Sequence, residues 1–260
     1  MRLTRVYVET PLASGSVVQL PSDTASHLAK VLRARAGDEL ILFNGDGREF
    51  NGAIETVRGS RVSASVGDSR PVDRESPLGI TLVQCVPRGD RMDFIVQKAT
   101  ELGVSRIVPV LSQRSVVRLD KSQAESKAVH WRAVSISACE QCGRNRLPAI
   151  EAAQPLLNYL GDSSPGAGLR LVFEPESMLH ADTAAQNHGG PSDSTMESAE
   201  IAIGPEGGFA PEELEAFRVA GFSQVGLGPR ILRTETAAIA AVVWLQARFG
   251  DLGDREAPCG

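Results

Sequence analysis

From Ile80 onward the chain alternates short apolar runs with amphipathic segments, and this alternation restricts its possible folds more than any other feature. The run "ITLVQCVP" at 80–87 is mostly apolar, as expected of a strand that is buried on both faces. The next segment, "RMDFIVQKATEL", has apolar residues at helical spacing and is followed by Gly103, a typical helix stop. Strands that alternate with helices predict an α/β domain with a mostly parallel sheet.

The alternation continues to the C-terminal part of the chain. Strands are expected at "RIVPVL", "LRLVF", "IAI" and "QVGLG", and helices at about 121–142, at "PEELEAFRVA" and at about 235–249. The last helix is apolar on nearly all sides from Ala237 to Leu245, which favours burial in a core or in a subunit interface. Residues 180–199 are polar, small and aperiodic, and we expect them to form a mobile surface loop.

Residues 1–70 have a different pattern. Segments such as "RVYVE", "ELILFN" and "RVSASV" are β-branched or alternating, and glycine or Asn/Asp turns separate them. Many short strands in so small a unit predict a compact β-barrel. Charge and proline content indicate a linker at 71–79, so the second domain is expected to cover 80–250.

Composition limits the class of protein. The chain has 260 residues, of which 42% are hydrophobic, so it is long enough to bury a core. Its longest apolar run has nine residues, far short of the ~20 that span a bilayer, and its first residues lack the apolar centre of a signal peptide. Four unevenly spaced cysteines do not suggest a disulfide framework. We therefore expect a cytoplasmic protein without a membrane partner.

The net charge of −5 is distributed unevenly. Residues 84–146 carry 11 basic and 6 acidic side chains, whereas residues 147–260 carry 6 and 16. A basic middle segment in an acidic protein is consistent with a binding surface for a polyanion, but also with an ordinary solvated surface. Charge alone leaves both interpretations open.

The stretch "IGPEGGF" at 203–209 follows an expected buried strand and precedes a helix. Its glycines allow the backbone to approach a ligand closely, and ligands of α/β sheets bind beyond the carboxyl ends of strands. The stretch is neither a P-loop nor a dinucleotide-binding turn, and its carboxylate Glu206 would repel phosphate. A neutral or cationic ligand fits the loop better, although a simple tight turn would also explain it.

The stretch "LGPRILRTETA" at 227–237 is a second unusual loop between a strand and a helix. Gly228 and a proline follow the strand, two arginines flank an apolar pair, and Thr234 is a good residue for a helix N-cap. Two such loops at strand ends of one sheet favour a pocket over two coincidental turns.

The basic segment contains "ACEQCGRNR", with a single C-x-x-C. One pair of cysteines without histidines at ligand spacing is weak evidence for zinc, which needs four ligands, so no metal is expected. Arg144 and Arg146 lie on a polar loop after the expected helix, and Lys98 and Glu101 could form a surface pair on an earlier one.

Taken together, "RMDFIVQKATELGV", "ACEQCGRNR", "IGPEGGF" and "LGPRILRTETA" resemble the family of small-subunit RNA methyltransferases named for 16S rRNA (uracil(1498)-N(3)) methylation. The four motifs occur in the same order as in that family, and the resemblance covers nearly the whole chain. It implies a PUA-like RNA-binding barrel at 1–70 and, at 80–250, a SPOUT-type domain whose chain forms a trefoil knot. It also implies a homodimer that uses S-adenosylmethionine as methyl donor.

The resemblance further implies that the enzyme methylates uracil N3 of 16S rRNA in the small ribosomal subunit. The cofactor is expected at three loops, formed by residues Phe173, Glu174, Pro175, Ile203, Gly204, Glu206, Gly207, Gly208, Leu227, Gly228, Leu232, Arg233 and Thr234. Arg233 or Arg230 is expected to stabilise negative charge on the uracil, and Glu235 is a candidate base. The residues expected to contact RNA are Arg88, Arg91, Lys98, Arg114, Arg144 and Arg146.

Other functions compete with this interpretation. A SPOUT methyltransferase that acts on a different base or on ribose would carry the same motifs. A non-catalytic RNA-binding protein that has lost its cofactor is a second alternative, which the intact glycine loops disfavour. A nicotinamide dehydrogenase is disfavoured because the chain lacks G-x-G-x-x-G.

Overall fold

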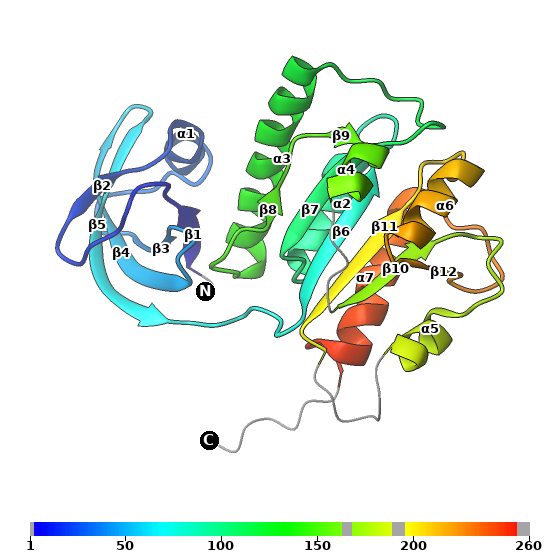
Figure 1. Ribbon diagram of the computed structural model, residues 1–260. Coiled ribbons are helices and arrows are strands. Elements are labelled where there is room, and N and C mark those ends of the chain that lie inside the picture. Colours follow the sequence, from blue (N-terminus) through cyan, green and yellow to red (C-terminus); the bar gives the residue numbers. More distant parts are fainter. Residues whose placement is uncertain (1–2, 163–167, 189–195, 254–260) are drawn as a thin grey trace. The chain divides into compact units, whose positions relative to one another are not determined.

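The computed structural model describes residues 3–162, 168–188 and 196–253 (Figure 1). The chain divides into two compact units. Unit 1 comprises the chain up to Glu75 together with Ile136–Leu147, and unit 2 comprises Ser76–Ser135 and the chain from Pro148 onward. The boundary between Glu75 and Ser76 lies inside the segment 71–79 that the sequence marks as a linker. The return of Ile136–Leu147 to unit 1 was not predicted, because helical periodicity does not reveal a long-range partner.

Unit 1 is built on a five-stranded sheet in the order β1-β3-β4-β5-β2. Strand β1 pairs with β3 in parallel, and the other pairs are antiparallel. Apolar side chains of the strands and of one helix form its core, which includes Val6, Leu42 and Phe50. The elements are β1 (Thr4–Tyr7), β2 (Val17–Gln19), α1 (Ser22–Lys30), β3 (Glu39–Phe43), β4 (Arg48–Arg58) and β5 (Arg61–Pro71).

A buried ionic cluster holds the second segment of unit 1 in place. The Glu49 carboxylate is 1% exposed and accepts hydrogen bonds from Arg5 at 2.7 Å and from Arg74 at 3.2 Å. Arg5 also donates to Asn145 Oδ1 at 2.6 Å, and Arg74 donates to the carbonyl of Gly143 at 2.9 Å. The stretch after helix α3 is therefore fixed to β1 and β4 by charged hydrogen bonds, which are among the stronger ones in proteins.

Unit 2 contains a parallel sheet in the order β12-β10-β11-β6-β7-β8, with β9 also paired to β7, as the alternating sequence predicts. Its strands are β6 (Gly79–Cys85), β7 (Arg106–Leu111), β8 (Ala149–Ile150), β9 (Gln154–Pro155), β10 (Leu169–Phe173), β11 (Ser198–Ile203) and β12 (Ser223–Val225). Its helices are α2 (Arg91–Glu101), α4 (Leu156–Asp162), α5 (Ala181–His188), α6 (Pro211–Val219) and α7 (Thr234–Phe249), together with the first part of α3 (Lys121–Cys142).

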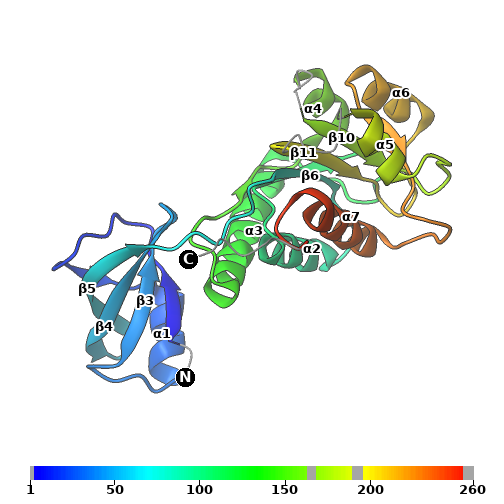
Figure 2. The same ribbon diagram turned by 90° about the horizontal axis from the view of Figure 1, so that it is seen from below.

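Helices cover both faces of this sheet. Successive strand residues point to opposite faces, so Leu82 and Ile201 pack against α2 and α7 while Val83 and Ala202 pack against α4 and α6. Figure 2 shows α2 and α7 on one side of the sheet and α4 and α6 on the other. Both faces are therefore buried, which explains why the central strands are apolar at nearly every position.

The prediction of a mobile loop at 180–199 is wrong for its two ends. Residues Ala181–His188 form α5, and β11 already begins at Ser198. Ala181, Ala184 and Ala185 are buried against the same core as α7, and the Trp244 indole donates to Asp182 at 3.0 Å. Among the described side chains of α5 the buried ones are all alanines, and such small side chains did not stand out from the polar residues around them, which explains the error. Residues 189–195 lie outside the described residues.

Candidate functional site

Three neighbouring parallel strands of unit 2 end at the same edge of the sheet. Strand β10 lies between β11 and β12, and their register aligns Phe173 with Ile203 and Val225, the last residue of each strand. The loops that follow these strands lie together at this edge (Figure 1). This is the position at which parallel α/β sheets bind ligands.

The three loops enclose a cavity of about 710 Å³. A smaller pocket of about 40 Å³ lies beside it and shares Phe173, Glu174, Pro175, Leu232 and Ala237 with it. The larger cavity is lined by Phe173, Glu174, Pro175, Ile203, Gly204, Glu206, Gly207, Gly208, Leu232, Arg233 and Thr234 among others, and the smaller pocket adds Leu227 and Gly228. The structure thus brings together every residue that the sequence predicted for the cofactor site.

The glycine loop, residues 204–208, has a backbone shape that suits glycine. Gly208 has a φ of +66°, in the left-handed region that other residues avoid. A Cβ on Gly204 would lie 3.2 Å from the ring of Phe209. The loop ends in a reverse turn, in which the Gly208 amide donates to the Pro205 carbonyl at 2.9 Å. The loop therefore presents backbone to the cavity.

Thr234 was predicted to be the N-cap of the last helix, and this is wrong. Arg233 occupies the N-cap position, and Thr234 is the first helical residue. The Thr234 hydroxyl donates instead to the Gly204 carbonyl at 2.8 Å and accepts from Gln84 Nε2 at 2.9 Å. These buried bonds hold the start of α7 against the ends of β6 and β11. A tertiary contact has replaced the local cap that the sequence favours.

Only some of the acidic residues near the glycine loop face the cavity. Glu213 is buried and accepts hydrogen bonds from the backbone amides of Ala210 at 2.9 Å and Gln113 at 2.7 Å, so it closes the start of α6. Glu174 and Glu176 line the cavity. Burial, and then repulsion by Glu176, raises the pKa of Glu174 above its ordinary value.

The predicted catalytic residues have different surroundings. Arg233 is exposed and lines the larger cavity, and Arg230 is exposed and lines the smaller pocket. Glu235 lines neither, and its Oε1 atom lies 3.9 Å from Arg91 Nε. The two arginines are therefore placed to meet a ligand, whereas Glu235 faces a neighbouring side chain.

Several residues predicted to contact RNA have partners within the protein. Arg91 pairs with Glu206 at 2.5 Å, and Lys98 pairs with Glu101 at 2.8 Å. Arg114 lines the cavity and donates to the carbonyl of Gly207 at 3.2 Å. Arg88 and Arg146 are exposed. The charge pattern marked these residues as candidates for RNA binding, but it could not identify the partners of Arg91, Lys98 and Arg114 within the protein.

The prediction that Arg144 contacts RNA is wrong. Its side chain is 5% exposed and its guanidinium forms an ion pair with Glu75 at 2.5 Å, within unit 1. A buried and paired arginine cannot reach an RNA phosphate, so Arg144 is a structural residue of unit 1. The glycine-started loop after α3 looked exposed in the sequence because its partners lie about 70 to 140 residues away.

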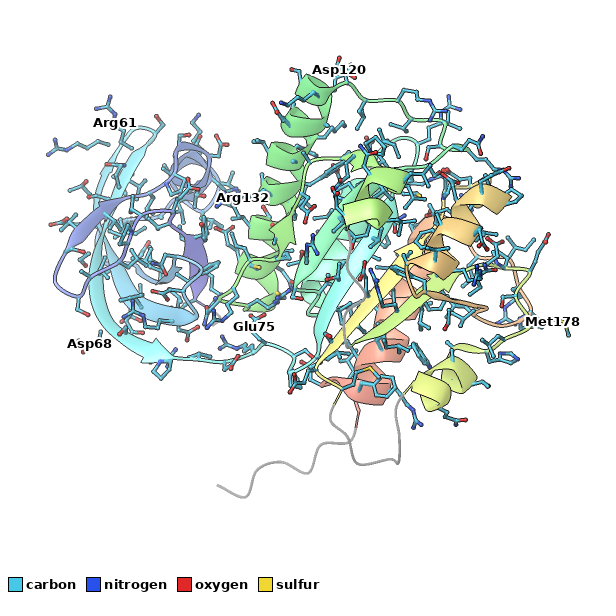
Figure 3. The ribbon with its side chains drawn as sticks, in the orientation of Figure 1. Arg61, Asp68, Glu75, Asp120, Arg132 and Met178 are labelled. Carbon is cyan, nitrogen blue, oxygen red and sulfur yellow. The ribbon has the colours of Figure 1, made fainter. Side chains whose placement is uncertain are left out.

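The sequence did not single out several residues of the cavity wall. These include Glu176 and Ser177 after β10, Gln224 in β12, and the apolar Leu214 of α6. Ile231 is 86% exposed, and Met178, which is 95% exposed, points away from the sheet at the tip of the loop after β10 (Figure 3). An isolated apolar residue in a loop carries no periodic signal, so pattern analysis does not detect it.

Two further observations concern the described part of the chain. None of its helices is long and apolar enough to cross a membrane. Within the same residues, no group of three or more His, Cys, Asp or Glu side chains could hold a metal ion.

Family models match both units. Residues 74–246 match the model described as RNA methyltransferase domain, and residues 20–66 match the RNA methyltransferase PUA domain. These matches confirm the predicted order of a PUA-like domain followed by an α/β methyltransferase domain.

Curated relatives span nearly the same length. The chain is 32% identical to a ribosomal RNA small subunit methyltransferase E of Buchnera aphidicola, over 96% of this chain and 98% of the relative. It is also 32% identical to the protein of the same name from Bacillus subtilis, over 86% of this chain and 87% of that one.

Solved structures agree with these matches. A Legionella pneumophila protein in complex with its bound cofactor S-adenosylmethionine is 37% identical, with a TM-score of 0.88 over 97% of this chain and all of that one. A Neisseria gonorrhoeae ribosomal RNA small subunit methyltransferase E bound to S-adenosylmethionine is 35% identical, with a TM-score of 0.84 over 96% and 100% of the two chains. This chain therefore belongs to the ribosomal RNA small subunit methyltransferase E family.

Proposed function

We propose that this protein transfers a methyl group from S-adenosylmethionine to N3 of uracil 1498 in 16S rRNA of the small ribosomal subunit. The observation that carries the proposal is the cavity itself, in which the two unusual loops of the sequence meet the loop after β10, which the family resemblance implies, at one edge of the sheet. A relative matched over 96% of this chain is named ribosomal RNA small subunit methyltransferase E, and two similar structures were solved with S-adenosylmethionine bound.

The residues of the cavity fit S-adenosylmethionine. The cavity volume of about 710 Å³ is within the usual range for small-molecule sites. Its wall presents backbone groups of the glycine loop and the carboxylates of Glu174 and Glu176, which suit the cationic groups of this ligand. Phe173, Ile203 and Leu232 supply apolar surface for the adenosine part.

The bound cofactor supplies a methyl group on a positively charged sulfur, and that S–C bond breaks as the new bond to uracil N3 forms. The uracil loses its N3 proton to solvent water, and the resulting negative charge spreads to the flanking carbonyl oxygens. We propose that Arg233, exposed on the cavity wall, stabilises this charge, and that Arg230 assists from the adjacent pocket. The main contribution of the protein is alignment of the two reactants.

We further propose that Arg88 and Arg146 contact RNA phosphates, because both are basic and exposed. We also propose that the protein works as a homodimer in the cytoplasm. Support for the dimer comes from the outer surface of α2 and α7, where Phe94 is 48% exposed and Val243 is 39% exposed. Sedimentation of the purified protein at several concentrations tests the dimer.

The function is tested by incubating the protein with methyl-labelled S-adenosylmethionine and small subunits from a bacterial strain that lacks its own enzyme. We expect label in 16S rRNA of the subunits and not in wild-type subunits, which are already methylated. Free 16S rRNA is included to identify the substrate particle. Absence of transfer to both RNA forms contradicts the proposal.

The catalytic assignment is tested by single-turnover reactions with R233A and E235A. We expect R233A to slow methyl transfer by about 100-fold, in the range found when one stabilising donor is removed. E235A is expected to retain most of the wild-type rate, because Glu235 does not line the cavity. If R233A retains the wild-type rate with bound RNA, the role of Arg233 is wrong.

A further inference from the structure

Arg91 lies at the first position of α2 and connects the glycine loop to the start of α7. Its Nη1 atom is 2.5 Å from Glu206 Oε1, in the centre of the glycine loop. Its Nε atom is 3.9 Å from Glu235 Oε1, at the start of α7. The guanidinium of Arg91 thus bridges the glycine loop and the start of α7.

The backbone that carries Arg91 is well anchored. Met92, Ile95, Val96 and Ala99 of the same helix are buried in the core beneath the sheet. Because α2 cannot move easily, its first side chain is a fixed support from which the glycine loop can be held.

The glycine loop is held at two further points by donors from other elements. The Thr234 hydroxyl donates to the carbonyl of Gly204, and Arg114 Nη1 donates to the carbonyl of Gly207 at 3.2 Å. Arg91 is the donor to the intervening residue, Glu206. A loop with three glycines has high conformational freedom, so external hydrogen bonds are needed to keep it in one shape.

We propose that Arg91 is a positioning residue, which holds the glycine loop in its ligand-binding shape through Glu206 and does not contact RNA. Its side chain does not line the cavity, whereas Glu206 does. The pairing also neutralises Glu206, so that the loop backbone, and not a mobile carboxylate, determines how the ligand is held. The consequence for ligand affinity rests on the proposed binding of S-adenosylmethionine.

The first test needs no ligand. Hydrogen exchange of the Gly208 amide, which donates to Pro205 within the loop, is compared in the full-length wild type, R91Q and R88Q. Arg88 is a matched control because it is exposed and lies only three positions earlier. The Arg91–Glu206 pair is partly exposed to water, so we expect exchange at Gly208 to be about two- to fivefold faster in R91Q and unchanged in R88Q. Equal exchange in R91Q and wild type overturns the positioning role, whatever the ligand is.

The second test measures affinity for S-adenosylmethionine by calorimetry in R91Q, E206Q, R91Q/E206Q and R91K. If Arg91 acts through Glu206, R91Q weakens binding about two- to fivefold, R91K restores part of it, and the double variant binds no worse than the weaker single variant. In turnover, the KM for S-adenosylmethionine should rise more than kcat falls.

The outcomes separate this inference from the proposed function. If R91Q binds S-adenosylmethionine as the wild type does but has a higher KM for the ribosomal subunit, Arg91 is an RNA contact and the inference is wrong. If the wild type does not bind S-adenosylmethionine, the proposed function fails, while the exchange experiment still decides whether Arg91 holds the loop.

Discussion

Replacing Thr234 with valine tests whether tertiary hydrogen bonds hold the loops of the cavity. Valine has nearly the same shape as threonine, so the change removes the hydroxyl without opening a void. Thr234 is 5% exposed and Gln84 is fully buried, so water cannot replace the lost partner. The carbonyl of Gly204 loses its donor, and Gln84 Nε2 keeps only its bond to the Cys85 carbonyl at 2.8 Å.

The expected cost follows from these lost partners. An unsatisfied buried polar group costs about 1–3 kcal/mol, and two groups are affected, one of them partly. We therefore expect T234V to lower the free energy of unfolding by about 2–4 kcal/mol, which corresponds to a Tm decrease on the order of 10 °C for a unit of this size. The control T234S keeps the hydroxyl and loses one methyl group, at about 1 kcal/mol.

Trp131 is buried in the core of unit 2, so tryptophan fluorescence reports the unfolding of this unit in urea or on heating. T234V should unfold at clearly lower denaturant concentration than T234S. If the two variants are equally stable, the hydroxyl does not support the cavity and the reasoning is wrong.

Three further predictions test other parts of the structure. At neutral pH, E49Q should destabilise unit 1 by about 3–5 kcal/mol, because it leaves the buried guanidinium of Arg5 without its carboxylate, and hydrogen exchange in β4 measures the loss. Burial raises the pKa of Glu49, but hydrogen bonds from Arg5 and Arg74 outweigh burial and hold the pKa below its ordinary value of 4.5. The stabilisation of unit 1 by the Glu49 carboxylate is therefore complete above pH 4.5. The difference in stability between wild type and E49Q should shrink as the pH falls through the lowered pKa. G208A should destabilise unit 2 by about 1–2 kcal/mol because φ is +66°, whereas G161A at the exposed end of α4 should stabilise it by about 0.5–1 kcal/mol; equal effects in urea unfolding would contradict this. Burial raises the pKa of Cys85 to about 12, so N-ethylmaleimide at pH 8 should label Cys85 only in unfolded protein, as mass spectrometry of the peptides can show.

The regular elements of unit 2 could be predicted from sequence because burial on both faces of the sheet gives a continuous apolar signal. Strands such as β6 and β7, and the long helix α3, occur where periodicity placed them. The cavity was also predictable, since two of its loops follow a strand and have glycines and prolines that mark unusual backbone, whereas the loop after β10 was expected only from the family resemblance. Parallel pairing then brings the strand ends together without further information.

Partners that are distant in sequence could not be predicted. Arg91 and Glu206 are 115 residues apart, and Arg144 and Glu75 are 69 residues apart, so local charge patterns identified the arginines as candidates for RNA. Thr234 has the chemistry of an N-cap, but its hydroxyl forms hydrogen bonds with Gln84 and with the Gly204 carbonyl instead. In each case a tertiary contact decided the role of a side chain whose local sequence favoured another.

The measurement that tests the central claim most directly is the position of the methyl group on the RNA. Small subunits that lack the modification are incubated with the purified protein and S-adenosylmethionine, and the 16S rRNA is then examined by nucleoside mass spectrometry and primer extension. We predict N3-methyluridine at position 1498, with a stop in primer extension because the methyl group blocks base pairing. A methyl group on another atom or nucleotide, or none at all, would contradict the account.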